Sequence, residues 1–515
     1  MKCIYFLMIL TLIMPTSACA QSEEVIAHPI VLDREELNLH GQECLILVPE
    51  NRHKANSRRI AVHYFRFPAK KASGKAPIFY LPGGPGDSYS LRDFYGYFSG
   101  KRARIFAQEI SFLNQQHDII LLNQRGNAEA PGFNGTQFKY WVPNGKPDQL
   151  YDLPVLFQEE QNKLMEKVAA LQQQGVDVSG YDILNLVDDI ESLRQYYQYG
   201  KISLVGSSFG SQWALSYLRQ YPEQVERAFL SGLEPIDYSR DDPAEVWKVY
   251  QELARLAEAD SNIRRDLPAV GLIEALKTII RRLEKRPQVV QLPAQDGGAE
   301  IRIPIGADAV RLHVTNPFAR NRQESLSTWP KYIHELYEGN YELLATYLAE
   351  NRRGYELDIL LNPLVDNSLG ISEVRRNKLA NQPEKRWIAD GSDFWEALRN
   401  AAPTRDVGDA FRQQQKSEVP ILMLHGNLDR STPLENALSL QAYFPYHHLL
   451  QVKGGTHAAK WQLAFANPDL MRKLWSFLDG EGKDMPKDLP TTFSLPAIEF
   501  LPIQGPTLLE RLQQD

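Results

Sequence analysis

The segment KISLVGSSFGSQWALSYLRQ (201–220) contains the residues of this chain whose types and spacing are best suited to chemistry. Gly206, Ser208 and Gly210 lie between a mostly apolar run and an amphipathic segment. Two glycines at this spacing let a strand and a helix approach closely at a tight turn, and the serine between them is then held out at the top of a sheet. The pattern predicts a nucleophile elbow with Ser208 as the nucleophile.

A serine hydroxyl is a weak nucleophile, so it needs a base to take its proton and a carboxylate to orient that base. In chains with this turn the acid and the histidine follow the serine in that order, each after a later strand. Asp429 and His457 each lie just past an apolar run in the required order. We therefore predict a triad of Ser208, Asp429 and His457. His425 is the competing base, but it precedes Asp429 and so comes in the wrong order.

Attack on a carbonyl also requires backbone donors for the oxyanion that forms. One donor is predicted at Phe209, the residue after the nucleophile. The other is predicted in the loop LPGGPGDSYS (81–90), where Gly83 and Gly84 expose N–H groups with no side chain in the way. Taken alone this loop could be an ordinary turn. The loop follows an apolar run, as do the loops that contain Ser208, Asp429 and His457. This shared position favours an oxyanion hole.

Short apolar runs that end in turn signals recur along the chain and must position these residues. Because they lack polar alternation, they predict strands buried on both faces of a largely parallel sheet. Helical spacing recurs between them, for example within 181–197. The alternation predicts an α/β fold, doubly wound with a mostly parallel central sheet. The predicted strands lie in 76–84, 117–126, 201–206, 226–232, 419–426 and 447–455.

From about Asp237 to about Gln415, helical patterns dominate, most clearly at 333–353 and 393–401. We predict a mainly helical cap insertion over the carboxyl edge of the sheet, where ligands of open α/β sheets bind. An independent helical domain docked elsewhere is the alternative, because spacing does not show where an insertion packs. The predicted units are 1–20, a signal peptide; 21–236, the first part of the core; 237–415, the cap; and 416–515, the second part of the core.

The first residues have the three parts of a secretory signal: Lys2, an apolar run over 4–14 and a small-residue site at Ala18-Cys19-Ala20. A lipid-carrying Cys19 is an alternative, and a retained anchor is disfavoured because the run is shorter than the roughly 20 residues of a span. The sequence predicts export to the periplasm or the medium. Cys44 alone then remains in a cleaved, unlipidated chain, which excludes an internal disulfide.

Composition narrows the classes of function. The chain has 515 residues, of which 43% are hydrophobic and 23% charged, as in folded globular proteins. Its formal net charge of −7 provides no basic footprint for nucleic acid or an anionic membrane. No cluster of cysteine and histidine has metal-ligand spacing, so no metal or cofactor is predicted. The sequence leaves the oligomeric state open.

Several motifs together resemble one family, the prolyl and tripeptidyl aminopeptidases among the α/β hydrolases. The segment CLILVPENR (44–52) is similar to the exported tripeptidyl branch. The resemblance implies a serine peptidase that releases residues from peptide amino termini, with catalytic roles on Ser208, Asp429 and His457. The motifs are LPGGPG (81–86), LLNQRGN (121–127), YDILNLVDDIESLR (181–194), GSSFGSQWALSYLRQYPEQVERAFLSG (206–232), GNLDRSTP (426–433) and GGTH (454–457).

Two departures from the family weaken any transfer of substrate preference. Many relatives have Asp where this chain has Asn123, and Gly-Gly-Ser-Tyr-Gly where it has the elbow Gly-Ser-Ser-Phe-Gly. An aminopeptidase must also hold a free α-amine, which requires unpaired carboxylates near the first pocket. Glu234 and Asp237, just past the apolar run 226–232, are the candidates, although acidic residues at a strand end are usually solvated.

Two other functions stay open at this stage. The same triad and oxyanion hole cleave esters and amides alike, so an esterase acting on small molecules is one alternative. A non-catalytic binding protein on a hydrolase scaffold is the other. A missing nucleophile, base or oxyanion glycine would favour it, and none is missing. The predicted substrates are short peptides, because a cap excludes large folded ones.

Overall fold

A computed structural model describes residues 24–34, 37–90, 101–126, 140–142, 149–293, 300–351, 355–357, 361–389 and 391–514. The predicted signal peptide, with Cys19, lies outside these residues. The strands are β1 Glu24–Arg34, β2 Leu37–Pro49, β3 Arg59–Phe67, β4 Ile78–Leu81, β5 Ile119–Leu122, β6 Tyr140–Val142, β7 Ile202–Ser207, β8 Val225–Ser231, β9 Gln288–Leu292, β10 Ile301–Ile305, β11 Tyr355–Leu357, β12 Ile421–Gly426, β13 His447–Lys453 and β14 Thr492–Ser494.

The main sheet has 10 strands in the order β1-β2-β3-β5-β4-β7-β8-β12-β13-β14. From β5 to β14 every neighbouring pair is parallel, and β1, β2, β3 and β5 pair antiparallel at the other edge. Every residue of β4, β5 and β12 is buried, as expected of strands covered on both faces. The mostly parallel α/β sheet and its six predicted strands are confirmed. The long N-terminal antiparallel strands were not predicted.

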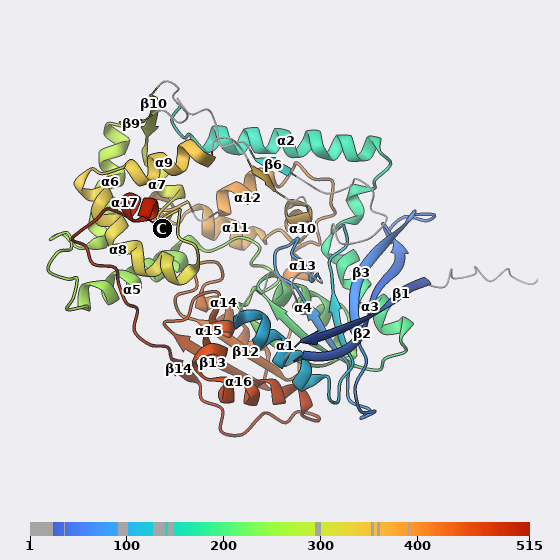
Figure 1. Cartoon of the computed structure of the whole chain (residues 1–515). Coiled ribbons are helices and arrows are strands. Elements are labelled where there is room, and N and C mark those ends of the chain that lie inside the picture. The colour runs from blue at the N-terminus through green and yellow to red at the C-terminus, as the bar shows by residue number, and fades with distance from the viewer. Residues whose placement is uncertain are drawn as a thin grey trace, which may run out of the picture.

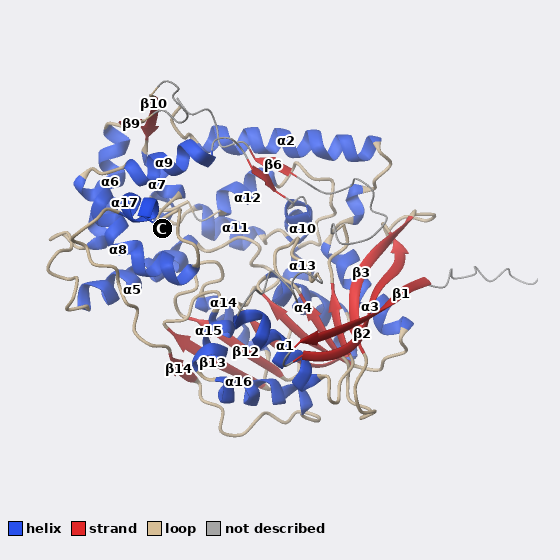
Figure 2. Cartoon of the chain, in the orientation of Figure 1, coloured by secondary structure: helices blue, strands red, loops and turns tan. Residues whose placement is uncertain are grey.

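Helices cover both faces of this sheet (Figure 1, Figure 2). The apolar sides of α3 and α4 belong to the core cluster on one face, whereas α1, α15 and α16 belong to the cluster on the other. The helices are α1 Lys101–Leu113, α2 Leu153–Gln173, α3 Ile183–Tyr196, α4 Phe209–Gln220, α5 Pro243–Ala259, α6 Leu272–Lys285, α7 Ala307–Leu312, α8 Arg322–Glu338, α9 Glu342–Asn351, α10 Leu361–Leu369, α11 Glu373–Ala380, α12 Ser392–Leu398, α13 Asp409–Arg412, α14 Leu434–Leu440, α15 Ala459–Ala466, α16 Pro468–Trp475 and α17 Leu508–Gln514.

Helices α5 to α9 form a helical part with its own apolar core, beside the carboxyl edge of the sheet (Figure 1). Two segments outside the predicted range 237–415 pack against helices within it. Helix α2 lies along α12, where the rings of Phe157 and Phe394 meet edge to face at 5.6 Å. The C-terminal segment inserts Ile503 and Leu508 into the helical core. Conversely, α10 packs into the cluster that contains α3, so the range 237–415 is not one separate unit.

The helical pattern at 333–353 spans parts of two helices, α8 and α9. Helix α8 ends at Glu338, where Gly339 adopts a left-handed φ of 92° and its N–H caps the helix. Glycine reaches this conformation without the steric cost that a Cβ would add, and it commonly terminates helices for that reason. Helix α9 then begins at Glu342, and its buried leucines join the helical core.

A buried ionic network joins the loop after β5 to the first helices. Arg125 is fully buried, and its Nε and Nη2 donate to the two carboxylate oxygens of Asp189 at 2.8 and 2.6 Å. Its Nη1 donates to the carbonyls of Glu50 and Gly180 at 2.6 and 2.9 Å. Every side of the guanidinium is thus used, and the loop that follows β5 is fixed against β2 and α3.

Replacing Arg125 by Ala should cost about 3–5 kcal/mol of unfolding free energy, because it leaves Asp189 charged and buried without this partner. Urea denaturation followed by circular dichroism measures the loss. The matched control is Arg255→Ala on α5, whose exposed guanidinium pairs only with Glu252 and whose loss should leave the midpoint almost unchanged. Equal midpoints for the two variants would contradict a supporting role for the network.

Candidate active site

Ser208 occupies the turn between β7 and α4 in a strained backbone conformation, with φ 57° and ψ −134°. A positive φ is uncommon for a residue with a side chain. Neighbouring contacts explain how the turn is held: a Cβ on Gly206 would lie 2.3 Å from the carbonyl oxygen of Gly210, and one on Gly210 would lie 2.2 Å from that of Leu81. Only glycine fits at either position. The turn therefore has the form of a nucleophile elbow, with a partly exposed serine at its tip.

Asp429 and His457, predicted from loops after two different strands, lie together. His457 Nδ1 donates to Asp429 Oδ2 at 2.8 Å, which leaves Nε2 as the nitrogen able to accept a proton. Asp429 is fully buried, and its Oδ1 accepts from the backbone N–H of Ser431 at 2.9 Å and of Thr432 at 3.0 Å. The Thr432 hydroxyl donates to Asp429 Oδ2 at 2.6 Å. This set of donors holds the carboxylate as an anion.

The electrostatics of Asp429 follow from these contacts. Burial alone would raise the pKa of this carboxyl, but the charge of His457, the hydrogen bond from its ring and the Thr432 hydroxyl together lower the pKa well below its usual value. The acid is therefore ionised at neutral pH. An ionised partner fixes the ring tautomer and stabilises the imidazolium that forms when the histidine takes a proton.

His425, the competing base, has a different role. Both of its ring nitrogens are occupied: Nε2 donates to the Thr432 carbonyl at 2.6 Å, and Nδ1 accepts from the backbone N–H of Leu233 at 3.2 Å. Burial lowers the pKa of the ring, so the neutral form is favoured. His425 thus connects the loop after β12 to the loop after β8 and has no ring nitrogen left for a proton transfer.

The predicted oxyanion loop lies directly against the elbow. A Cβ on Gly83 would lie 3.4 Å from the Cβ of Ser208, so the loop backbone is in contact with the serine. Gly84 has a φ of 103°, and a Cβ there would come within 2.5 Å of the Gly86 nitrogen. The Phe209 N–H lies at the first residue of α4, where helix N–H groups lack partners within the helix. Gly83 and Phe209 therefore lie next to the serine, and Gly84 follows Gly83 in the same loop.

The loop after β5 holds the oxyanion loop in place, which the sequence did not reveal. Gln124 accepts from the Gly86 N–H at 2.8 Å and donates to the Gly83 carbonyl at 2.7 Å. Beside it, Asn123 accepts from the Tyr89 N–H at 2.6 Å and donates to the Tyr89 carbonyl at 2.7 Å. An aspartate could not donate to that carbonyl, which gives the departure at Asn123 a structural meaning.

Comparison with known families agrees with this geometry. Residues 76–266 match the model of the alpha/beta hydrolase fold family, and residues 391–464 match that of the TAP-like proteins. The chain is an α/β hydrolase. No curated protein matches it.

Solved structures with the same fold are distant from this α/β hydrolase. MGS-M2, an alpha/beta hydrolase enzyme from a Medee basin deep-sea metagenome, is 12% identical with a TM-score of 0.35, over 83% of this chain and 97% of that one. The 2-hydroxy-6-oxo-6-phenylhexa-2,4-dienoate hydrolase of Rhodococcus sp. RHA1 is 14% identical with a TM-score of 0.32, over 84% and 98%. Epoxide hydrolase VrEH1 of Vigna radiata is 14% identical with a TM-score of 0.32, over 82% and 94%.

Glu234 lies beside the elbow of the hydrolase, in the loop after β8. Its N–H donates to Ser211 Oγ at 2.9 Å, and that hydroxyl donates to the Ser208 carbonyl at 2.7 Å. Among the described residues, no donor contacts its carboxyl. Burial, and the negative charges of Asp241, Asp366 and Asp429, raise the pKa of Glu234 well above its usual value. An unpaired carboxyl near a nucleophile is suited to binding a cation.

Asp366 on α10 is a second acid near Glu234, and the sequence carried no signal for it. It is 7% exposed, and its nearest cation is Arg240 at 4.0 Å. Burial raises its pKa to about 7, although Arg240 lowers it. Asp237, the other predicted carboxylate, is engaged instead: its two oxygens accept from the backbone N–H of Ser372 at 2.5 Å and from the Ser372 hydroxyl at 2.7 Å. It connects the loop after β8 to the start of α11.

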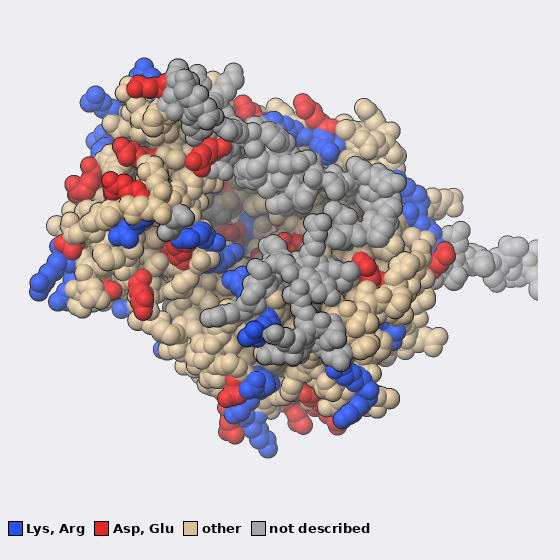
Figure 3. All heavy atoms as spheres, in the orientation of Figure 1, with Lys and Arg blue, Asp and Glu red and all other residues tan. Residues whose placement is uncertain are grey.

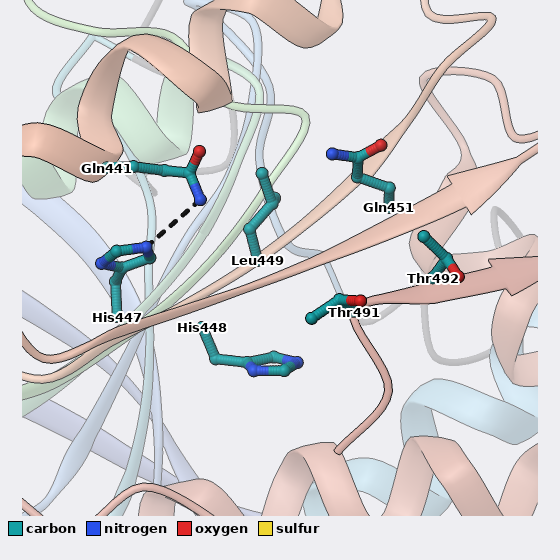
Figure 4. Close-up of a pocket in the computed structure, with 7 residues that line it drawn as sticks. All are labelled: Gln441, His447, His448, Leu449, Gln451, Thr491 and Thr492. Carbon is teal, nitrogen blue, oxygen red and sulfur yellow. Dashed lines mark hydrogen bonds between the residues drawn. The ribbon is translucent and has the colours of Figure 1, made fainter.

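The surface is hollowed between the helical part and the sheet, with acidic and basic side chains around the hollow (Figure 3). A separate cavity of about 230 Å³ lies at the start of β13, the end of the strand far from His457 (Figure 4). There His447 Nε2 accepts from Gln441 at 3.2 Å, and no triad residue lines the cavity.

Within the described ranges, no set of three His, Cys, Asp or Glu side chains is grouped to hold a metal, and no helix has the length and apolarity of a membrane span.

Replacing Gln124 by Ala should lower kcat by about 10- to 100-fold with little change in KM. The oxyanion loop then loses its two hydrogen bonds to Gln124, while the residues that line the pocket are unchanged. Loss of one oxyanion donor outright lowers kcat by about 10²–10³-fold, so a displaced donor should cost less. Steady-state kinetics on an activated ester or anilide measures both constants. Gln115→Ala is the control, since its exposed amide bonds only to the Ser111 carbonyl. A raised KM with an unchanged kcat would contradict this role.

Proposed function

We propose that this hydrolase is an exported serine aminopeptidase that releases proline or short peptides from the amino termini of peptides. The observation that carries the proposal is the carboxyl of Glu234, two hydrogen bonds from the Ser208 backbone and unpaired among the described residues. A peptide amino terminus is a cation that an esterase substrate does not have. A carboxylate at this place would fix where the chain begins relative to the bond that is cut.

The proposed reaction uses the residues that lie together at the carboxyl edge. His457 Nε2 takes the proton of Ser208 as the hydroxyl attacks the scissile carbonyl, and Asp429 holds the ring and stabilises the imidazolium. The N–H groups of Phe209 and of Gly83 or Gly84 stabilise the oxyanion. His457 then gives its proton to the leaving amine, and water resolves the acyl-enzyme by the same route.

Two further supports come from the surroundings of the site. Asp366 adds a second carboxyl near Glu234, and two acids together bind an ammonium group more strongly than one. The TAP-like match over 391–464 includes the loops of Asp429 and His457.

Export rests on the N-terminal sequence alone, with its basic residue, apolar run and small-residue cleavage site.

A substrate panel tests the proposal: aminoacyl, dipeptidyl and tripeptidyl anilides with free and with acetylated amines, beside short acyl esters. Rapid cleavage of the free-amine anilides alone is expected, with kcat falling about 10⁵–10⁶-fold in Ser208→Ala. The tripeptidyl and prolyl members then define the length and residue preferred. Cleavage of esters alone would reject the aminopeptidase and retain the hydrolase. Turnover that survives in Ser208→Ala would reject the triad.

The dependence of kcat/KM on pH should report the ionisation of the Glu234 carboxyl. A raised pKa means that the carboxylate appears only at a higher pH than for an ordinary glutamate, so kcat/KM for a free-amine anilide should rise with pH through the range where Glu234 ionises. Glu234→Gln should remove this rise and lower kcat/KM by about 10- to 100-fold, the worth of a charged hydrogen bond.

Two comparisons make the measurement specific to the amine. An acylated anilide has no ammonium group, so its profile should be the same in the wild type and in Glu234→Gln. Asp237→Asn, which alters an acid already engaged by Ser372, should leave the kcat/KM profile for the free amine intact. A profile that is lost in Asp237→Asn and kept in Glu234→Gln would assign the amine to the other acid.

A further inference from the structure

Three arginines, Arg322, Arg430 and Arg102, lie near the candidate site, and no step of the mechanism uses them. Arg322 begins α8, and its Nη1 donates to Ser431 Oγ at 2.7 Å. The N–H of that same Ser431 donates to Asp429 Oδ1 at 2.9 Å. The guanidinium is thus connected to the catalytic acid through one residue. The whole group lies at the carboxyl edge of the sheet.

Within the part of the chain that the structure describes, the guanidinium groups of Arg322 and Arg430 contact hydroxyls and not carboxylates. Arg430, next to the catalytic acid, contacts three hydroxyls: Tyr250 at 2.9 Å, Thr315 at 3.2 Å and Ser325 at 3.4 Å. Across the described ranges, no carboxylate forms an ion pair with Arg322, Arg430 or Arg102. Arg322 is exposed at the surface, and the positive charges of Arg430 and Arg102 and the negative charge of Asp429 lie near it. Such a cluster favours an anion that comes from outside the chain.

The position of Arg322 indicates which part of a substrate would meet it. Gln323, the next residue, accepts at 3.3 Å from Gln462 on α15, the helix that begins just after His457. His457 delivers the proton to the leaving amine, so this is the side on which the leaving portion of a peptide lies. Glu234 instead contacts Ser211 of α4, the helix that begins just after Ser208. Asp429 lies close enough to act electrostatically on both Glu234 and Arg322.

We propose that Arg322, with Arg430 and Arg102 beside it, binds the free α-carboxylate of the leaving portion, so that the preferred substrates are short peptides with both ends uncapped. A guanidinium presents a planar fork that matches a carboxylate, and the hydroxyl contacts of Arg322 and Arg430 hold these forks ready. The inference rests on the proposed aminopeptidase function. It adds that the enzyme distinguishes a small peptide from the amino terminus of a long chain.

The test compares a tetrapeptide with a free carboxylate against the same tetrapeptide with a C-terminal amide, both with free amines. Wild-type kcat/KM for the acid should exceed that for the amide by about 10-fold or more, as expected of a charged hydrogen bond. In Arg322→Ala, kcat/KM for the peptide acid should fall to the value for the peptide amide. Arg322→Lys should keep part of the difference in kcat/KM between the two peptides. Cleavage of a free-amine anilide, which has no carboxylate, should stay unchanged in both variants.

Arg320→Ala is the matched control, because that guanidinium lies in the segment just before α8 and is already paired with Glu324 at 3.4 Å. It should keep the full preference for the acid. Equal rates for acid and amide in the wild type would overturn the inference and leave the aminopeptidase standing. An equal loss on the anilide in Arg322→Ala would also overturn it, since Arg322 would then act only by positioning Ser431 and Asp429.

A binding measurement keeps the inference testable apart from turnover. Calorimetry on Ser208→Ala should detect tighter binding of the tetrapeptide acid than of its amide, and Arg322→Ala in that background should abolish the difference. Equal binding of the two peptides would overturn the inference whatever the enzyme cleaves. Failure of every free-amine anilide in the panel would reject the proposed function, whereas this difference in binding depends on Arg322 alone.

Discussion

The strained backbone at Ser208 is the constraint on which the other parts of the site depend. A residue with a side chain in this region costs on the order of 1–3 kcal/mol, and it persists only where its surroundings fix it. Here the Ser208 N–H donates to the Ser231 carbonyl at 3.1 Å, and its own carbonyl accepts from the N–H and the hydroxyl of Ser211 at 2.8 and 2.7 Å. Strand β8 and helix α4 thus hold the turn from both sides, which keeps the nucleophile in one orientation.

From that turn the site extends along the edge of the sheet in strand order. Ser208 follows β7, Glu234 follows β8, Asp429 follows β12 and His457 follows β13, and these strands are neighbours. Parallel pairing brings the carboxyl ends to one edge, so residues more than 200 positions apart meet without any long connection.

The parts of this molecule that could be predicted from sequence are those governed by local patterns. The elbow turn at Ser208 and the pairing of Asp429 with His457 could be anticipated because turn chemistry and chain order are specific. The buried parallel strands could be predicted because their apolar runs are uninterrupted. Asp366 and Arg322 gave no such signal, since each acquires its meaning from residues far away in the chain. The same holds for α2, whose pattern is an ordinary amphipathic helix and whose place beside α12 is set by tertiary packing.

Long-range packing also explains why the cap boundaries were hard to draw. Patterns along the chain mark where helices dominate, but they do not state which core a helix joins. Helix α10 falls inside the helical stretch of sequence and packs with α3, whereas the last helix falls outside it and packs with α9 and its neighbours. The split after Glu338 depends on one glycine, and the periodicity on either side of it is equally regular.

The C-terminal segment has a consequence for how the chain acquires its structure. The buried ammonium of Lys331 donates to the Ile503 carbonyl at 2.7 Å, and the Leu508 N–H donates to Glu335 at 3.0 Å, so the last turns close the far side of the helical core. A growing chain cannot make these contacts until residues 503–508 have been synthesised. Until then the leucines and isoleucines of α6, α8 and α9 have no complete cover, and such surfaces are what folding helpers bind. Completion of the helical core therefore waits for residues 503–508, although most of that core is synthesised long before them.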